Sequence, residues 1–172
     1  VIWLLGGDTN LERNLRTEAN NRGVSPARLI FSSRTAYASY LARYRLADLF
    51  LDTFPFNAGT TASDALWVGL PIITCSGETF ASRMAGSLLR AVGLAELVTR
   101  SLVEYEALAL RLARDPDRLA AIKAKLARNR DSYPLFDTVR FTRHLESAFE
   151  MMCERVQQGK PPSSFAVEPI AR

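Results

Sequence analysis

The chain has 172 residues, of which 48% are hydrophobic and 23% are charged, and its formal net charge at pH 7 is +4. These values are typical of a folded globular domain that buries its own core, and they exclude a disordered chain. No apolar run approaches the ~20 residues of a membrane-spanning helix and no secretory signal pattern is present, so we expect a cytoplasmic protein that does not bind a membrane.

Short apolar segments alternate with amphipathic segments in the first half of the chain. Strands are predicted at residues 1–5, 28–32, 49–52 and 71–74, and helices at 10–21, 37–45, 60–68 and 80–91. Gly23 and Gly93 end the first and the last of these helices. Apolar strands joined by helical crossovers indicate an α/β fold, with a parallel Rossmann-like sheet flanked by helices.

Beyond Leu97 the pattern becomes purely helical. Three C-terminal helices are predicted at residues 102–114, 116–129 and 138–158, and no further strand is expected. The segment after residue 158 is rich in proline and serine, which predicts a loose tail. We therefore divide the chain into a Rossmann-like part (1–98), C-terminal helices (99–158) and a tail (159–172). Because Val1 opens directly on a strand pattern without a start methionine, we interpret the chain as a fragment.

The positive charge and the two cysteines narrow the possible partners. Arginine and lysine residues gather between residues 111 and 130 without an aromatic platform or a recognition-helix signature, which predicts a solvated surface and no nucleic-acid partner. Cys75 and Cys153 stand far apart and outside any metal-ligand spacing, which predicts free thiols. We expect no metal and no other cofactor.

Small and polar residues follow each predicted strand, at 6–8, 32–37, 52–61 and 74–79. Any one such turn is more often explained by helix capping alone. In open α/β sheets, however, ligands bind beyond the carboxyl ends of the strands. Four such turns together therefore predict a binding cleft.

The turn around Asn57 leads directly into the helix predicted at Thr60. A helix start presents unpaired N–H groups and the positive end of the helix dipole, so Gly59, Thr60 and Thr61 form a candidate phosphate or diphosphate site. Asp64 lies three positions after Thr61. Its carboxylate could complete a capping box at the helix start or accept hydrogen bonds from sugar hydroxyls, and the spacing favours neither role. The turn at Gly77 and Glu78 is similarly open to a binding role or a capping role.

The segment LADLFLDTFPFNAGTTASDALWVGLPIITCSGETFASRMAGSLL resembles the core motif of the protein O-GlcNAc transferase and SPINDLY-type family. The resemblance extends more weakly over residues 1 to about 158. It implies the later part of the C-terminal domain of a GT-B glycosyltransferase, the domain that holds the nucleotide-sugar donor. An N-terminal catalytic domain, TPR repeats and a lysine that contacts the diphosphate would then precede Val1, so we expect the chain to be inactive alone.

The family pattern suggests a role for each matching residue. Thr60 and Thr61, with the Gly59 amide, would hold the donor diphosphate, and Asp64 would bind the ribose. Many members carry histidine at the position of Gly59, whereas glycine at this position looks familiar among bacterial members. Others carry a histidine near the nucleoside, at the position of Tyr40. The resemblance assigns the nucleoside pocket to Thr35, Tyr40 and Arg43, and a supporting turn to Asn57, Gly77 and Glu78.

The implied reaction transfers a sugar, GlcNAc from UDP-GlcNAc, to serine or threonine hydroxyls of an acceptor protein or peptide. No residue of the chain is assigned as a catalytic acid or base, and His144 stands mid-helix where a surface or packing role is expected. GDP-fucose remains an alternative donor, because no residue clearly selects the base. A non-hydrolysing UDP-GlcNAc epimerase shares the architecture, but the SGETFASR segment and the C-terminal helices disfavour it. A non-catalytic interaction module with a relic nucleotide cleft is a further alternative.

Overall fold

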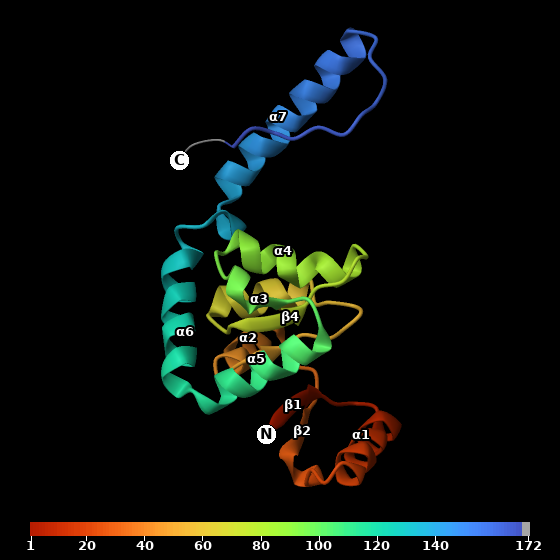
Figure 1. Cartoon of the computed structure of the whole chain (residues 1–172), viewed down its shortest axis with the longest axis vertical. Coiled ribbons are helices and arrows are strands. Elements are labelled where there is room, and N and C mark those ends of the chain that lie inside the picture. The colour runs from red at the N-terminus through yellow and green to blue at the C-terminus, as the bar shows by residue number, and fades with distance from the viewer. Residues whose placement is uncertain (170–172) are drawn as a thin grey trace. The chain divides into compact units, whose positions relative to one another are not determined.

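The computed structural model describes residues 1–169, which form two compact units, Val1–Leu46 and a second unit that begins at Ala47 (Figure 1). The last three residues of the predicted tail, 170–172, lie outside the described residues. The predicted division into 1–98, 99–158 and 159–172 stays a prediction.

The first unit is built from two parallel strands and two helices. Strand β1 (Ile2–Leu5) pairs with β2 (Leu29–Ser32), with Ile2 opposite Leu29. Helix α1 (Thr9–Asn21) begins at Asp8, whose carboxylate accepts the N–H groups of Asn10 and Leu11. Such a cap satisfies donors that the first helical turn leaves unpaired. A 3-10 turn (Pro26–Arg28) precedes β2, and α2 (Tyr37–Tyr44) follows it.

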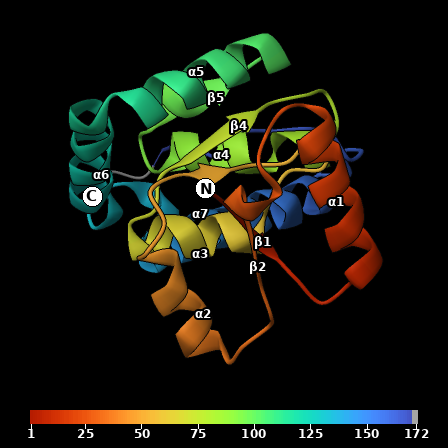
Figure 2. The same ribbon diagram turned by 90° about the horizontal axis from the view of Figure 1, so that it is seen from below.

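The second unit contains a three-stranded parallel sheet in the order β3-β4-β5. Helices α3 and α4 cover one face of the central strand β4, and α5 covers the other (Figure 2). All four residues of β4 are buried, as the continuous apolar strand pattern predicts. The elements are β3 (Phe50–Leu51), α3 (Thr60–Val68), β4 (Ile72–Cys75), α4 (Met84–Ala91), β5 (Val98–Thr99) and α5 (Leu102–Arg114).

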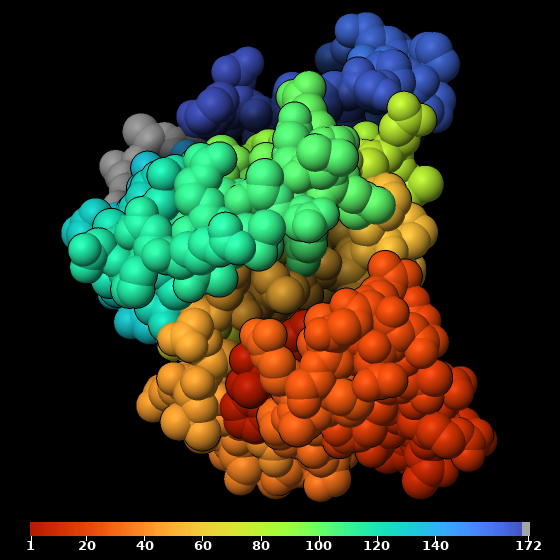
Figure 3. Space-filling model, turned by 60° about the horizontal axis from the view of Figure 1, so that its bottom comes forward, coloured from red at the N-terminus to blue at the C-terminus, as the bar shows by residue number. Residues whose placement is uncertain are grey.

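Two further helices complete the second unit. Helix α6 (Pro116–Arg130) contacts α5, and their surfaces form one continuous green and teal face in Figure 3. Helix α7 (Thr138–Gln157) follows a 3-10 turn (Pro134–Phe136) and has no buried residue. Ser101, Asp115 and Asp137 cap α5, α6 and α7 with their side chains.

The sequence predicted most of these elements, and two expectations need correction. The expected absence of strands after Leu97 is wrong, because Val98–Thr99 pairs with Thr74–Cys75 of β4. Val98 and Thr99 belong to no apolar run of three residues, such as the run at residues 49–51 that indicated β3, so no strand pattern is present there. The helix predicted at 80–91 starts later, since a 3-10 turn (Ala81–Arg83) precedes α4. There Ser82 exchanges hydrogen bonds with Thr79, which holds the chain out of α-helical geometry.

Residues 1–169 contain both cysteines of the chain. Both cysteines are free thiols, Cys75 buried and Cys153 exposed, in agreement with the prediction. Within that range, no group of three or more histidine, cysteine or acidic residues could hold a metal ion. None of the helices described there combines the length and the apolar composition needed to cross a bilayer.

Candidate functional site

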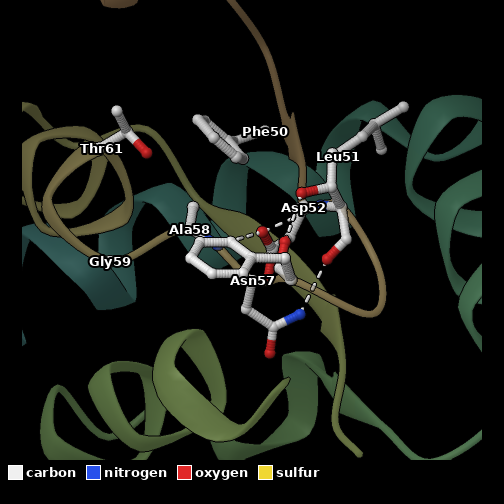
Figure 4. A pocket seen from close by; sticks show the side chains of 9 residues that line it. Phe50, Leu51, Asp52, Asn57, Ala58, Gly59 and Thr61 are labelled. Carbon is white, nitrogen blue, oxygen red and sulfur yellow. Dashed lines mark hydrogen bonds between the residues drawn. The ribbon is translucent and has the colours of Figure 1, made fainter. Parts of the chain in front are cut away.

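A cavity of about 370 Å³ lies at the carboxyl end of β3, where the chain turns into α3 (Figure 4). Its wall is formed by residues 50–53, 56–59 and Thr61. The end of a parallel strand that feeds a helix is the place where α/β proteins bind ligands. The cavity therefore coincides with one of the polar turns predicted from the sequence.

The first turn of α3 has amides that no protein group takes up. Helix α3 begins with the bond from the Ser63 N–H to the Gly59 carbonyl, 3.0 Å, and no side chain caps it. Among the described residues, no hydrogen bond is recorded for the N–H groups of residues 59–62. These donors stand at the positive end of the helix dipole, which favours an anion.

Of the residues predicted to bind the diphosphate and ribose, Gly59 and Thr61 line this cavity. Thr60 is exposed in the same first turn of α3, and Asp64 is half-buried one turn further along. A Cβ added at Gly59 would meet only the Met84 side chain, at 3.5 Å, so the wall is open there. The structure thus brings Gly59 and Thr61 together at the cavity, with Thr60 beside them.

Two buried polar side chains hold the turn before α3. One carboxylate oxygen of Asp52 accepts the N–H groups of Thr53, at 2.9 Å, and Ala58, at 2.8 Å. The Asn57 amide donates to the carbonyls of Thr53, at 2.8 Å, and Cys75, at 3.3 Å. Asn57 was predicted to support the turn, and its Oδ1 has no partner within the described part of the chain.

The Asp52 carboxylate is linked to the rest of the sheet. Its other oxygen accepts the Thr74 hydroxyl at 2.6 Å, and the Tyr105 hydroxyl of α5 donates to its backbone carbonyl at 2.9 Å. Burial raises the pKa of Asp52, although its hydrogen bonds from Thr74, Ala58 and Thr53 act in the opposite direction. Burial, followed by electrostatic interactions with Asp52 and Cys75, raises the pKa of Tyr105 to about 12.

Gly77 and Glu78 lie at a different hollow. They follow β4 and, with Arg90 and Arg100, line a second space of about 620 Å³. A Cβ at Gly77 would stand 2.6 Å from the Ser82 hydroxyl, so the close approach requires glycine. The structure therefore places these two supporting residues at a neighbouring turn and not in the wall of the first cavity.

The three residues predicted for the nucleoside pocket belong to the first unit. Arg43 donates to the Ser33 carbonyl at 2.9 Å, and its guanidinium stands 5.8 Å from the centre of the Trp3 ring. The Tyr40 hydroxyl donates to the Tyr44 hydroxyl at 2.8 Å. Thr35 lies in the segment between β2 and α2. Their joint role with the α3 turn stays a prediction.

Comparison with known proteins places the chain in a family. The model of glycosyl transferase family 41 matches residues 1–145. The chain belongs to glycosyl transferase family 41. The predicted resemblance to the O-GlcNAc transferase and SPINDLY-type family is thereby confirmed.

Similar proteins support this assignment to family 41. The UDP-N-acetylglucosamine--peptide N-acetylglucosaminyltransferase of Caenorhabditis elegans is 38% identical over 94% of the chain. The Arabidopsis thaliana "Probable UDP-N-acetylglucosamine--peptide N-acetylglucosaminyltransferase SEC" is 38% identical over 97%. The chain covers 14% and 17%, respectively, of the lengths of these two proteins.

A solved structure confirms the fold class. A mutant of the Thermobaculum terrenum O-GlcNAc transferase superposes with a TM-score of 0.85 and 36% sequence identity. The match covers 91% of the chain and 31% of the solved protein. The α/β architecture with parallel strands, flanking helices and C-terminal helices is therefore that of a partial family 41 catalytic region.

Sequence reasoning did not single out Asp52, Thr74 or Tyr105 as parts of the site. Asp52 and Thr74 were each predicted as the last residue of a strand (49–52 and 71–74) and the first residue of a polar turn (52–61 and 74–79), without a role in the site. A polar residue at the end of an apolar strand was the available signal. Tyr105 lies 53 positions from Asp52, and nothing in its local pattern indicates the contact.

The raised pKa of Asp52 makes a testable difference to stability. Because the folded state disfavours the ionised carboxylate, the free energy that Asp52 contributes is fully present below the ordinary pKa of 3.8 and is lost as pH rises through the folded pKa. Asp52→Asn does not titrate. We expect the stability of the wild type, measured relative to Asp52→Asn by urea unfolding, to fall as pH rises across this window. A difference that is constant or grows with pH would contradict the assigned cause.

Proposed function

We propose that the chain is the donor-binding part of a protein glycosyltransferase and holds the diphosphate of UDP-GlcNAc at the start of α3. The observation that carries the proposal is the set of unpartnered amides at residues 59–62, beside a cavity at the carboxyl end of β3. Thr60 and Thr61 add hydroxyl donors in the same turn. Membership of family 41 and the names of the relatives support the nucleotide-sugar class.

In this proposal the reaction is a direct displacement at the anomeric carbon of the sugar by a serine or threonine hydroxyl of the acceptor protein. A bond forms between the hydroxyl oxygen and the anomeric carbon, the bond from the sugar to the diphosphate breaks, and negative charge grows on the departing UDP, which takes up the hydroxyl proton. The α3 amides, its dipole and the threonine hydroxyls stabilise that charge. A preorganised donor of this kind lowers a barrier by about 3 kcal/mol. We expect the site to use these donors without a metal ion.

The remaining predicted residues complete the proposed donor site. Asp64 would bind the ribose, and Thr35, Tyr40 and Arg43 would contact the nucleoside. Asn57, Gly77 and Glu78 would fix the turns that surround the sugar nucleotide. Transfer itself would need the parts of a longer protein that bind the acceptor, the proposed N-terminal catalytic domain and TPR repeats, so we expect the chain alone to bind donor without turnover.

Calorimetric titration tests the proposal. We expect the chain to bind UDP and UDP-GlcNAc in preference to GDP and GDP-fucose, and Thr61→Ala to weaken UDP binding about tenfold, because one hydrogen bond to a charged group is lost. Thr142→Ala is the matched control, since Thr142 is exposed on α7 and its hydroxyl bonds only the Thr138 carbonyl of its own helix.

Each other outcome selects a different function. A preference for GDP and GDP-fucose would replace the proposed donor with that of a protein O-fucosyltransferase. Equal loss of affinity in Thr61→Ala and Thr142→Ala would remove α3 from the site. Failure of both the chain and a longer protein to bind any nucleotide would leave the non-catalytic interaction module.

A further inference from the structure

Asp52 is a buried acid that the proposed transfer step does not use. Only 6% of its surface is exposed, and it directly follows β3 and forms part of the cavity wall. Burying a carboxylate is costly unless hydrogen bonds replace the lost water. Here three protein donors do so: the N–H groups of Thr53 and Ala58 at one oxygen and the hydroxyl of Thr74 at the other.

These bonds close the loop that leads into α3. Thr53 and Ala58 stand near the two ends of the loop, so one carboxylate oxygen ties both ends together (Figure 4). Inside the loop, Thr53 donates from its hydroxyl to the Phe56 carbonyl at 2.6 Å, and Asn57 donates to the Thr53 carbonyl. The fixed Ala58 amide directly precedes Gly59, so the direction of the first α3 amides follows from the closed loop.

The loop is also anchored to two strands of the sheet, β4 and β5, and to helix α5. The Thr74 hydroxyl reaches Asp52 from β4, and the Thr99 hydroxyl of β5 donates to the Thr74 carbonyl at 3.0 Å. From α5, the Tyr105 hydroxyl donates to the Asp52 carbonyl. Thr74 is fully buried, so this support does not compete with water.

We propose that Asp52 is a positioning residue, which holds the loop before α3 so that the amides of residues 59–62 face the donor diphosphate. The inference rests on the proposed function. Both carboxylate oxygens are occupied by protein donors, so Asp52 acts through the loop and not as a base. Its negative charge is directed at internal N–H and O–H groups, which reduces its repulsion of a nearby diphosphate.

Asparagine at position 52 keeps the shape of the side chain and one acceptor oxygen, but its NH2 group cannot accept the Thr74 hydroxyl. Thr74→Val removes the same bond from the other partner with little change in volume, and Thr74→Ser retains the hydroxyl. Asp48→Asn is the control for a lost acidic charge, because the Asp48 side chain is 87% exposed and meets only Lys123, at 3.4 Å.

The test combines amide hydrogen exchange across residues 53–62 with calorimetric titration of UDP-GlcNAc into the whole chain. We expect Asp52→Asn and Thr74→Val to speed exchange in this segment selectively and to weaken binding about tenfold. Thr74→Ser and Asp48→Asn should match the wild type in both measurements. Exchange that rises along the entire chain in Asp52→Asn would show a merely structural role and overturn the proposal.

The two measurements also separate this inference from the proposed function. Unchanged exchange and unchanged affinity in Asp52→Asn, with UDP-GlcNAc still bound by the wild type, would overturn the positioning role alone. A wild type that binds no UDP-GlcNAc would overturn the proposed function, and selective exchange in the variants would then show only that Asp52 orders the loop. If Asp52→Asn does not fold, the comparison of Thr74→Val with Thr74→Ser tests the positioning role in the same two measurements.

Discussion

Gly93→Ala is expected to destabilise the second unit by about 3 kcal/mol. Gly93 has a φ of +73°, and a Cβ there would overlap the Tyr133 ring and stand 2.7 Å from the Asn129 amide nitrogen. The left-handed conformation costs an alanine about 1–2 kcal/mol, and the overlap adds a cost of similar size. Asn129 is buried and donates to the Val92 carbonyl at 2.8 Å, so it cannot move without losing that bond.

Gly69→Ala is the matched control. Gly69 ends α3 with a φ of +90°, yet a Cβ there would meet nothing within 4 Å. Gly69→Ala therefore measures only the free energy of placing an alanine in the left-handed backbone conformation, about 1–2 kcal/mol. Urea unfolding of both variants measures the difference. Equal losses would show that Tyr133 and Asn129 yield freely, and that only the backbone conformation matters at Gly93.

Leu66→Ala is expected to cost about 3 kcal/mol of folding free energy. Leu66 is completely buried in α3, and truncating a buried leucine removes apolar contacts and leaves a cavity. Because α3 also carries the amides of the candidate site, loosening its packing should weaken UDP binding as well. Thermal and urea unfolding measure the first effect, and calorimetry measures the second.

Leu102→Ala, at the start of α5, removes the same atoms from a side chain that is 59% exposed. We expect its loss of stability to stay below 1 kcal/mol, since surface substitutions have small effects. A Leu66→Ala variant as stable as Leu102→Ala would show that the core around α3 collapses onto the smaller side chain.

Much of the fold could be predicted from the sequence because its elements have strong local signals. The bounds of α3 and α5 agree with the predictions, since small residues or caps mark their starts and a glycine or an aspartate follows their ends. Strand β5 was not predicted, because Val98 and Thr99 lack the longer apolar run that indicated the equally short β3. The 3-10 turn before α4 was not predicted, because it depends on the hydroxyl contacts between Thr79 and Ser82.

The candidate site also contains residues that the sequence could predict and contacts that it could not. Gly59 and Thr61 could be predicted from their own neighbourhood, because a turn of small residues before a helix is a local pattern. The separation of Gly77 and Glu78 from that cavity could not, since it depends on how the β4 turn is placed. The supporting contacts of Asp52 with Thr74 and Tyr105 join distant residues, and a single sequence gives no information about such pairs.

The difference between local and distant contacts has a consequence for how the site assembles during folding. The wall of the cavity comes from one short stretch of chain, whereas the bonds to Asp52 from Thr74 and Tyr105 span 22 and 53 positions. Contacts between distant residues require closure of long chain segments and form slowly. We therefore expect the loop to reach its final geometry late in folding, after α5 has docked on the sheet.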